Sequence, residues 1–323
     1  MSQQSSISQV VGALQEADSV CIVAHLRPDA DALGSVATLR LALEQLGKKT
    51  RCVIGQDWPI SENLFTIPGT DTVETATSLP QGYDLYVTVD CGSLDRTGVL
   101  APDLAKMIRR GNVVCIDHHA SNPGFGNINL VVAGCESTTT VLKSVLEELG
   151  VTINHDIAHA MYAGLVTDTG SFRWGSPRMH TLASELMEFE LDTKQISVDL
   201  LDSTTAEDLQ MLGRVLADVQ IVPAGNHTMA VLYGRYDVIS GHSDSAVETM
   251  VDFVRALDGT DMGVVFKEQM PGYWAVSLRS NDVNCAQVAA RLGGGGHVPA
   301  AGYSTQGEPE EIIAELVNIV DKL

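Results

Sequence analysis

Three side chains able to bind a metal ion lie within seven positions of one another in the segment AHLRPDADALGS near the start of the chain. Residues 19–24, just before them, are apolar and predict a buried strand, while the apolar spacing over 32–47 predicts a helix. We therefore expect His25, Asp29 and Asp31 in the loop at the carboxyl end of a strand. Open α/β sheets bind their ligands at such ends.

Similar side chains follow other apolar segments further along the chain. Asp90 comes after a predicted strand at 84–89, Asp168 comes after a buried helical segment, and a run of three such residues ends the predicted strand at 112–117. This run is Asp117, His118 and His119. An aspartate at one strand end is usually a helix cap or a turn former. Because parallel strands end along one edge, however, we expect these groups to converge in one crevice.

A crevice with this many carboxylates needs a cation, because buried like charges destabilise one another. The candidate ligands are carboxylates and imidazoles, and no thiolate is among them. This ligand set suits Mn²⁺ or a similar divalent ion, with Mg²⁺ and Co²⁺ as alternatives.

The elements that must position these groups alternate between strands and helices up to about residue 190. This alternation predicts a doubly wound, mostly parallel α/β domain over 1–190. Its strands are expected at 19–24, 50–55, 84–89, 112–117 and 128–132, and its helices at 32–47, 137–150, 155–170 and 179–190. A helical connector is expected over 191–217. A smaller α+β domain is expected over 218–323, with strands at 228–234, 261–269 and 273–280 and helices at 245–257, 284–292 and 308–323.

Composition narrows the class of protein further. The 323 residues carry 41 acidic and 20 basic side chains, a formal net charge of −21, which opposes tight binding of long duplex nucleic acid. The chain begins without the basic and apolar segments of a signal peptide, and no apolar stretch approaches the length of a membrane span. The six cysteines are scattered and predict buried, reduced thiols in a cytoplasmic protein.

Five segments together resemble one known family. HLRPDADALGS, VDCGSLDRTG, DHHASN and TDTGSFRW are similar to the four motifs of the DHH phosphoesterases, and GGGGHVPAAG at 293–302 is similar to the signature of their DHHA1 domain. Order and spacing most resemble the subgroup of nano-RNases that also dephosphorylate 3′-phosphoadenosine 5′-phosphate (pAp). One departure is Ala30, where the family often has glycine, and no carboxylate is lost by it.

The resemblance implies a role for each matching residue. His25, Asp29 and Asp90 would hold one metal ion, and a second set would hold another, with Asp90 bridging the two. The second set is Asp31, His118 and Asp168. Asp117 and His119 would be catalytic residues that orient ligands or meet the phosphate. Two ions about 3.5–4 Å apart can activate water for in-line displacement at phosphorus.

The second domain carries the expected substrate-binding residues. The glycines at 293–296 permit close backbone approach, and their N–H groups can form an anion-binding nest, beside which His297 adds a donor. A bare glycine run is otherwise a flexible loop. Arg279 and Ser280 end a strand and could bind a substrate phosphate, as could Arg173 in the first domain. These substrate-binding candidates are Arg173, Arg279, Ser280, Gly294, Gly295, Gly296 and His297.

The resemblance implies a homodimeric, metal-dependent phosphodiesterase with its catalytic crevice on the first domain and a cleft between the two domains. Its expected substrates are nano-RNA, linear dinucleotides such as pApA, pAp and cyclic di-AMP, all giving 5′-mononucleotides. The alternatives are a manganese inorganic pyrophosphatase, a RecJ-like single-strand exonuclease and a nucleotide sensor without turnover. His155 and His159, four residues apart on a predicted helix, lack the accompanying HExxH signature, and we do not count them as ligands.

Overall fold

The computed structural model describes residues 6–202, 204–280 and 282–323. The chain divides into two compact parts, unit 1 (Met1–Ser203) and unit 2 (Thr204–Leu323). The segment expected as a connector, 191–217, contains α7 (Thr193–Leu201) in unit 1 and α8 (Ala206–Ala217) in unit 2. Among the described residues, no helix is both long and apolar enough to cross a membrane.

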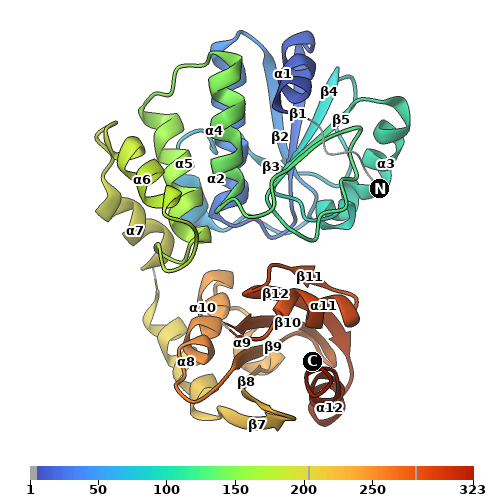
Figure 1. Cartoon of the computed structure of the whole chain (residues 1–323), viewed down its shortest axis with the longest axis vertical. Helices are drawn as coiled ribbons and strands as arrows, with labels where there is room; N and C mark the ends of the chain where they lie inside the picture. Colours follow the sequence, from blue (N-terminus) through green and yellow to red (C-terminus); the bar gives the residue numbers. More distant parts are fainter. Residues whose placement is uncertain (1–5, 203, 281) are drawn as a thin grey trace. The chain divides into compact units, whose positions relative to one another are not determined.

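Unit 1 is built on six strands. They are β1 (Ser19–Ala24), β2 (Lys49–Ile54), β3 (Glu74–Thr75), β4 (Leu85–Val89), β5 (Val113–Asp117) and β6 (Ile128–Val131). Neighbouring strands are parallel throughout, in the order β3-β2-β1-β4-β5-β6 (Figure 1). The sequence order of the strands reverses between β1 and β4. In doubly wound sheets the ligand crevice lies outside the strand ends at this reversal.

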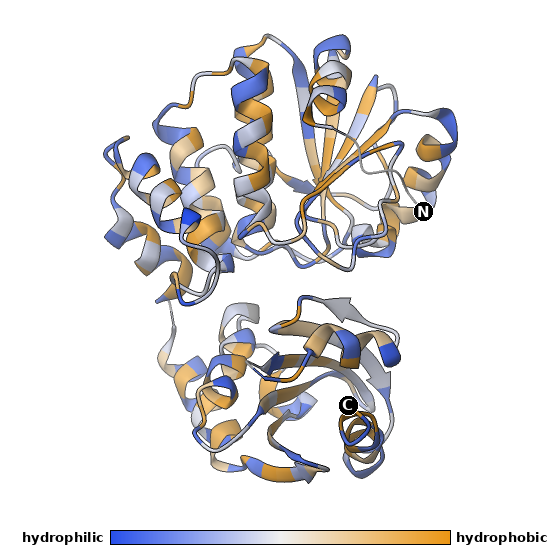
Figure 2. Ribbon diagram, viewed as in Figure 1, coloured by the Kyte–Doolittle hydropathy of each residue, from blue (hydrophilic) through white to orange (hydrophobic). Residues whose placement is uncertain are grey.

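Helices cover both faces of this sheet. The helices of unit 1 are α1 (Ile7–Glu16), α2 (Ala30–Gln45), α3 (Ala101–Arg110), α4 (Thr138–Leu149), α5 (His155–Asp168), α6 (Arg178–Met187) and α7, with short 3₁₀ segments η1 (Glu62–Thr66) and η2 (Leu94–Leu100). Of these, α6 and α7 pack against α5. Successive side chains of β1 point to opposite faces of the sheet. Ile22 joins the core formed with α2, α4 and α5, whereas Val23 packs with Leu104 of α3. Figure 2 shows the resulting concentration of hydrophobic residues along the central strands.

Helices α2 and α5 approach closely because each has a glycine at the contact. A Cβ added at Gly34 would lie 2.5 Å from the carbonyl oxygen of Ala160. A Cβ added at Gly164 would lie 2.5 Å from the Asp31 Oδ1 atom. No larger residue fits at either position unless its neighbours move, so the helices can lie side by side with Asp31 between them.

Unit 2 has a mixed sheet with helices on both faces. Its strands are β7 (Gln220–Ala224), β8 (His227–Gly234), β9 (Met262–Met270), β10 (Tyr273–Ser280), β11 (Gly295–Gly296) and β12 (Ala300–Gln306). Their order is β11-β12-β10-β9-β8-β7, and only the β8–β9 pair is parallel. The helices are α8, α9 (Tyr236–Ile239), α10 (Asp244–Arg255), α11 (Cys285–Arg291) and α12 (Pro309–Val320). One core lies against α11 and α12, and another lies against α8 and α10.

The predicted fold class is confirmed, since a parallel α/β unit precedes a smaller α+β unit. Sequence reasoning missed α1, α3, β7 and β12, whose apolar patterns are short or broken by glycine and proline. All six cysteines are free, and only Cys135 is partly exposed.

Candidate metal centre

The carboxyl ends of three neighbouring strands bring together most of the candidate ligands. His25 follows the last residue of β1, Asp90 follows β4, and Asp117 is the last residue of β5. These strands are adjacent in the sheet, with β1 beside β4 and β4 beside β5. The candidate ligands therefore lie at the place where the strand order reverses.

The prediction that Asp29 and Asp31 lie in a loop needs a correction. Asp29 is the N-cap of α2, because its Oδ1 atom accepts a hydrogen bond of 2.9 Å from the backbone N–H of Ala32. The helix consequently begins at Ala30, and Asp31 lies in its first turn. A capped start fixes both side chains more firmly than a loop would.

A first group of potential ligands consists of His25, Asp29 and Asp90, each offering one donor atom within 4.8 Å of the others. His25 Nε2 lies 3.7 Å from Asp29 Oδ2 and 3.5 Å from Asp90 Oδ2. The other ring nitrogen, Nδ1, lies 2.9 Å from the carbonyl oxygen of Leu26 and 3.3 Å from a guanidinium nitrogen of Arg96. The shorter contact favours a proton on Nδ1, which leaves Nε2 to face the carboxylates.

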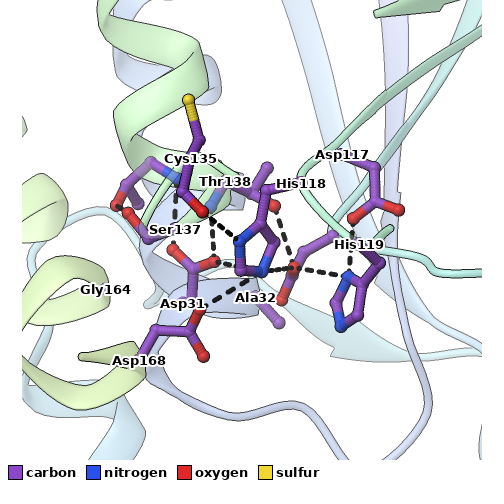
Figure 3. Close-up of polar contacts among 12 residues, drawn as sticks. Asp31, Ala32, Asp117, His118, His119, Cys135, Ser137, Thr138, Gly164 and Asp168 are labelled. Atoms are coloured by element: carbon purple, nitrogen blue, oxygen red, sulfur yellow. Dashed lines mark hydrogen bonds and ion pairs between the residues drawn. The ribbon is translucent and has the colours of Figure 1, made fainter. Parts of the chain in front are cut away.

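A second group consists of Asp31, His118 and Asp168 (Figure 3). His118 Nε2 lies 3.2 Å from Asp168 Oδ2 and 3.9 Å from Asp31 Oδ2. The Nδ1 atom of His118 lies 3.1 Å from the carbonyl oxygen of Cys135, to which it can donate. This hydrogen bond would again direct Nε2 toward the carboxylates.

Asp90 lies between the two groups. Its Oδ2 atom faces His25, and its Oδ1 atom lies 3.6 Å from His118 Nε2. Its backbone adopts the left-handed conformation, with φ of 56°, a region that aspartate and asparagine enter more readily than most residues. The side chain is only 2% exposed. Asp90 is therefore placed to serve both groups, as a bridging ligand must be.

Asp117 and His119 form a third arrangement. The fully buried Asp117 has its Oδ1 atom 2.8 Å from His119 Nδ1, while its Oδ2 atom accepts a 2.6 Å hydrogen bond from the Asn122 side chain. His119 Nδ1 also lies 3.6 Å from Asp90 Oδ1. Because both oxygens of Asp117 are engaged by side chains, this aspartate is better suited to orienting His119 than to taking part in chemistry.

Several carboxylates are buried close together here, and their pKa values are shifted as a result. Burial raises the pKa of Asp31 to about 7, and the charge of Asp90 adds to this effect. Burial also raises the pKa of Asp168 well above its usual value. Burial would lower the pKa of His25, but hydrogen bonds to Asp29 and Asp90 outweigh it and raise the pKa to about 10. Burial would raise the pKa of Asp90. The hydrogen bond with His25 and the charges of the neighbouring histidines outweigh burial and hold this pKa well below the usual range.

Protons on histidines and carboxyls therefore balance the charge in this arrangement. Divalent cations would balance the same charge without them, and the oxygen and imidazole donors fit such ions. The residues present thus fit the predicted metals.

Two threonines at the start of α4 support the centre, and sequence reasoning missed them. The backbone N–H groups of Thr138 and Thr139 donate to the two carboxylate oxygens of Asp31, at 2.7 and 3.1 Å. The Thr138 hydroxyl donates to Asp90 Oδ1 at 2.8 Å. The N-cap Ser137 accepts from the Thr140 N–H. The only signal in the sequence was this cap before a helix, which by itself says nothing about what the helix end faces.

The remaining candidates lie outside these groups. Arg173 is exposed in the segment that follows α5. Arg279 is partly exposed at the end of β10, close to Asp261 and Asp282 in a small pocket of unit 2. The Ser280 hydroxyl is buried and donates to the carbonyl oxygen of Asp261, while it accepts from the N–H groups of Asp282 and Val283. These contacts engage the hydroxyl within the fold, so we do not carry Ser280 into the proposed substrate site.

The glycine run of unit 2 is more ordered than the flexible loop that a bare run suggests. Gly295 and Gly296 form β11 and pair with β12. The N–H groups of Gly293, Gly294 and His297 donate to carbonyl oxygens of Ala290, Ala289 and Ala300. An anion-binding role for the run therefore depends on Gly295, Gly296 and the His297 side chain, and it stays a prediction.

Comparisons with known proteins agree with this geometry. Residues 19–165 match the model of the DHH family N-terminal domain, and residues 230–323 match the DHHA1 domain. The chain is 29% identical over 291 residues to the bifunctional oligoribonuclease and PAP phosphatase NrnA of Thermus thermophilus. The aligned region covers 89% of this chain and 84% of that protein.

Two further matches extend the comparison. The chain is 25% identical to the cyclic-di-AMP phosphodiesterase GdpP of Geobacillus thermodenitrificans, over 94% of this chain but 48% of that protein. An exopolyphosphatase-related protein from Bacteroides fragilis has the same fold, with a TM-score of 0.84 and 22% identity, over 100% of this chain and 98% of that one.

Proposed function

The chain belongs to the DHH phosphoesterase family and carries a DHHA1 domain, and on this basis we propose that it hydrolyses very short nucleotides at the centre in unit 1. The proposed substrates are nano-RNA, linear dinucleotides such as pApA, cyclic di-AMP and pAp, with 5′-mononucleotides as products. The names of its relatives, an oligoribonuclease and PAP phosphatase and a cyclic-di-AMP phosphodiesterase, support this substrate class.

One observation carries the proposal. Six carboxylate and imidazole side chains from distant segments form two groups, and Asp90 has one oxygen toward each. We propose that His25, Asp29 and Asp90 hold one divalent ion and that Asp31, His118 and Asp168 hold the other, with Asp90 shared. Ions in such a pair supply an activated water and stabilise the charge that develops on a phosphoryl group.

The chain's own residues would perform the other tasks. His119, fixed at Nδ1 by Asp117, has a second ring nitrogen that can donate a hydrogen bond or a proton to a phosphate oxygen. Arg173 would contact substrate phosphate. In unit 2, Arg279, the glycines at 295–296 and His297 would bind the part of the substrate remote from the bond that breaks. We further propose a homodimer that acts in the cytoplasm, the latter supported by six free cysteines.

A substrate panel tests the proposal. Purified protein would be given Mn²⁺ and, in separate reactions, pAp, pApA, cyclic di-AMP, pyrophosphate and a long single strand. We expect turnover of the first three and its loss when a chelator strips the protein, with recovery on adding Mn²⁺ back. Preferred turnover of pyrophosphate or of the long strand would favour the alternatives, and full turnover in stripped protein would exclude metal-dependent hydrolysis.

A further inference from the structure

An arginine and a tryptophan lie side by side next to the candidate metal centre, and neither has a role so far. Arg27 is in the segment after β1, two residues from both His25 and Asp29, and Trp58 is in the segment after the adjacent strand β2. The guanidinium carbon of Arg27 lies 5.7 Å from the centroid of the Trp58 ring. Both residues are exposed, and Trp58 keeps 39% of its surface open to solvent.

This pair is held in place by a buried side chain. Gln56 is 1% exposed. The side-chain oxygen Oε1 of Gln56 accepts a 2.7 Å hydrogen bond from the backbone N–H of Arg27. Its side-chain nitrogen Nε2 donates a 3.1 Å hydrogen bond to the backbone carbonyl oxygen of Trp58. Arg27 also has a φ of 52°, a left-handed conformation that a non-glycine residue holds only when its surroundings enforce it. The backbones of Arg27 and Trp58 are thus fixed relative to each other.

The guanidinium of Arg27 lies against an aromatic ring. The chain has 41 acidic residues, yet none of those in the described part forms an ion pair with the Arg27 guanidinium, whose contact is the Trp58 ring. An exposed aromatic ring beside an exposed guanidinium offers a stacking surface and a phosphate-binding group together. A nucleotide, which has both a base and a phosphate, can use both groups.

We propose that Trp58 and Arg27 form a nucleotide-binding platform, in which the base stacks on the Trp58 ring while Arg27 binds a phosphate oxygen of the same nucleotide. The proposal rests on the proposed function and specifies it further. Stacking does not depend on the hydrogen-bonding edge of a base, so this platform would accept all four bases with similar affinity. At this platform the enzyme would then not distinguish substrates by their base.

Steady-state kinetics on pApA with Mn²⁺ test the platform in the full-length protein. We expect Trp58→Ala to raise KM about 10-fold with little change in kcat, because stacking binds the substrate without entering the chemical step. Trp58→Phe, which keeps a ring, should restore most of the loss. Phe65→Ala is the matched control, since Phe65 of η1 is similarly exposed, at 42%, and should leave KM unchanged.

A binding measurement provides a readout that does not require turnover. AMP should quench the tryptophan fluorescence of the metal-loaded protein, whereas ribose 5-phosphate, which has no base, should not. The AMP quench should be lost in Trp58→Phe, whose remaining fluorescence comes from Trp174 and Trp274. Arg27→Ala should weaken AMP binding, and Arg27→Lys should restore part of it by keeping the charge.

Each outcome either supports or overturns the platform. A KM for Trp58→Ala equal to that of Phe65→Ala, or equal responses to AMP and ribose 5-phosphate, would overturn it. So would a fall in kcat together with lost metal, which would mean that Trp58 only supports the segment holding His25 and Asp29. If the wild-type protein hydrolyses no short nucleotide, the proposed function is wrong, and the AMP titration still decides the platform.

Discussion

The candidate metal-ligand groups of unit 1 and the glycine-rich run of unit 2 differ in what their polar atoms contact. In unit 1, carboxylates and imidazoles face one another; burial raises the pKa of Asp31, and the neighbouring carboxylates raise the pKa of His25. In unit 2, the Ser280 hydroxyl and three N–H groups of the run hydrogen bond within the fold. Polar groups whose charge the protein does not balance indicate a site for ions. Polar groups that hydrogen bond within the fold, as these four do, hold the backbone in place.

The largest expected effect comes from Asp90, which faces both ligand groups. Asp90→Asn keeps a residue that tolerates the left-handed backbone but removes the charge, so the loss is not due to strain. We expect kcat/KM on pApA to fall more than about 100-fold, beyond the effect usual for a single supporting residue. Metal content by elemental analysis should fall as well.

Asp95→Asn is the control for this change, because Asp95 is exposed five residues further along the chain. Near-normal turnover and metal content in Asp90→Asn, with large losses in Asp31→Asn, would show that Asp90 is not shared between two ions.

A smaller effect is expected from Thr138, which hydrogen bonds to two proposed metal ligands and is not itself a proposed ligand. Thr138→Val removes the hydroxyl that donates to Asp90 while the backbone N–H to Asp31 stays in place. We expect Mn²⁺ affinity, measured by titration calorimetry, to fall about 10–100-fold, and Thr138→Ser to restore it. Thr140→Val serves as the control, because the Thr140 hydroxyl contacts only Ser137 among the described side chains. Equal affinities in the two valine variants would refute a positioning role.

In unit 2, His297→Ala should affect some substrates and spare others. If His297 binds a remote part of the substrate, turnover of pApA should fall about 10-fold, because remote contacts help to position the phosphate that reacts. Bis-(p-nitrophenyl) phosphate has no second nucleotide, and its hydrolysis should change far less, with metal content unaffected. Arg279→Ala should show the same difference. Equal losses on both substrates would instead place His297 in the chemical step.

Ser280→Ala should change stability and leave kinetics almost untouched. The variant leaves the N–H groups of Asp282 and Val283 without their acceptor, so we expect the free energy of unfolding to fall by about 1–3 kcal/mol. Urea denaturation followed by fluorescence measures this change. Unchanged stability together with a higher KM for pApA would instead indicate that the Ser280 hydroxyl binds substrate.

The sequence was sufficient to place two of the site aspartates at strand ends. Asp90 and Asp117 each follow a short apolar run, and parallel strands necessarily end at one edge. Thr138 could not be predicted in this way, because its role depends on where the start of α4 packs against Asp31 and Asp90. The strand β12 was also missed, since its sequence, AAGYSTQ, is small and polar and gains its structure from pairing with β10.

The tight contact at Gly164 restricts how this chain can change during evolution. A Cβ at that position would lie 2.5 Å from Asp31 Oδ1 and 2.7 Å from the Thr139 side chain, so even alanine would displace a proposed metal ligand. A larger residue at position 164 is tolerable only if both Asp31 and Thr139 give way or are replaced. We therefore expect these three positions to vary as a unit among related sequences, with glycine retained wherever the aspartate is retained.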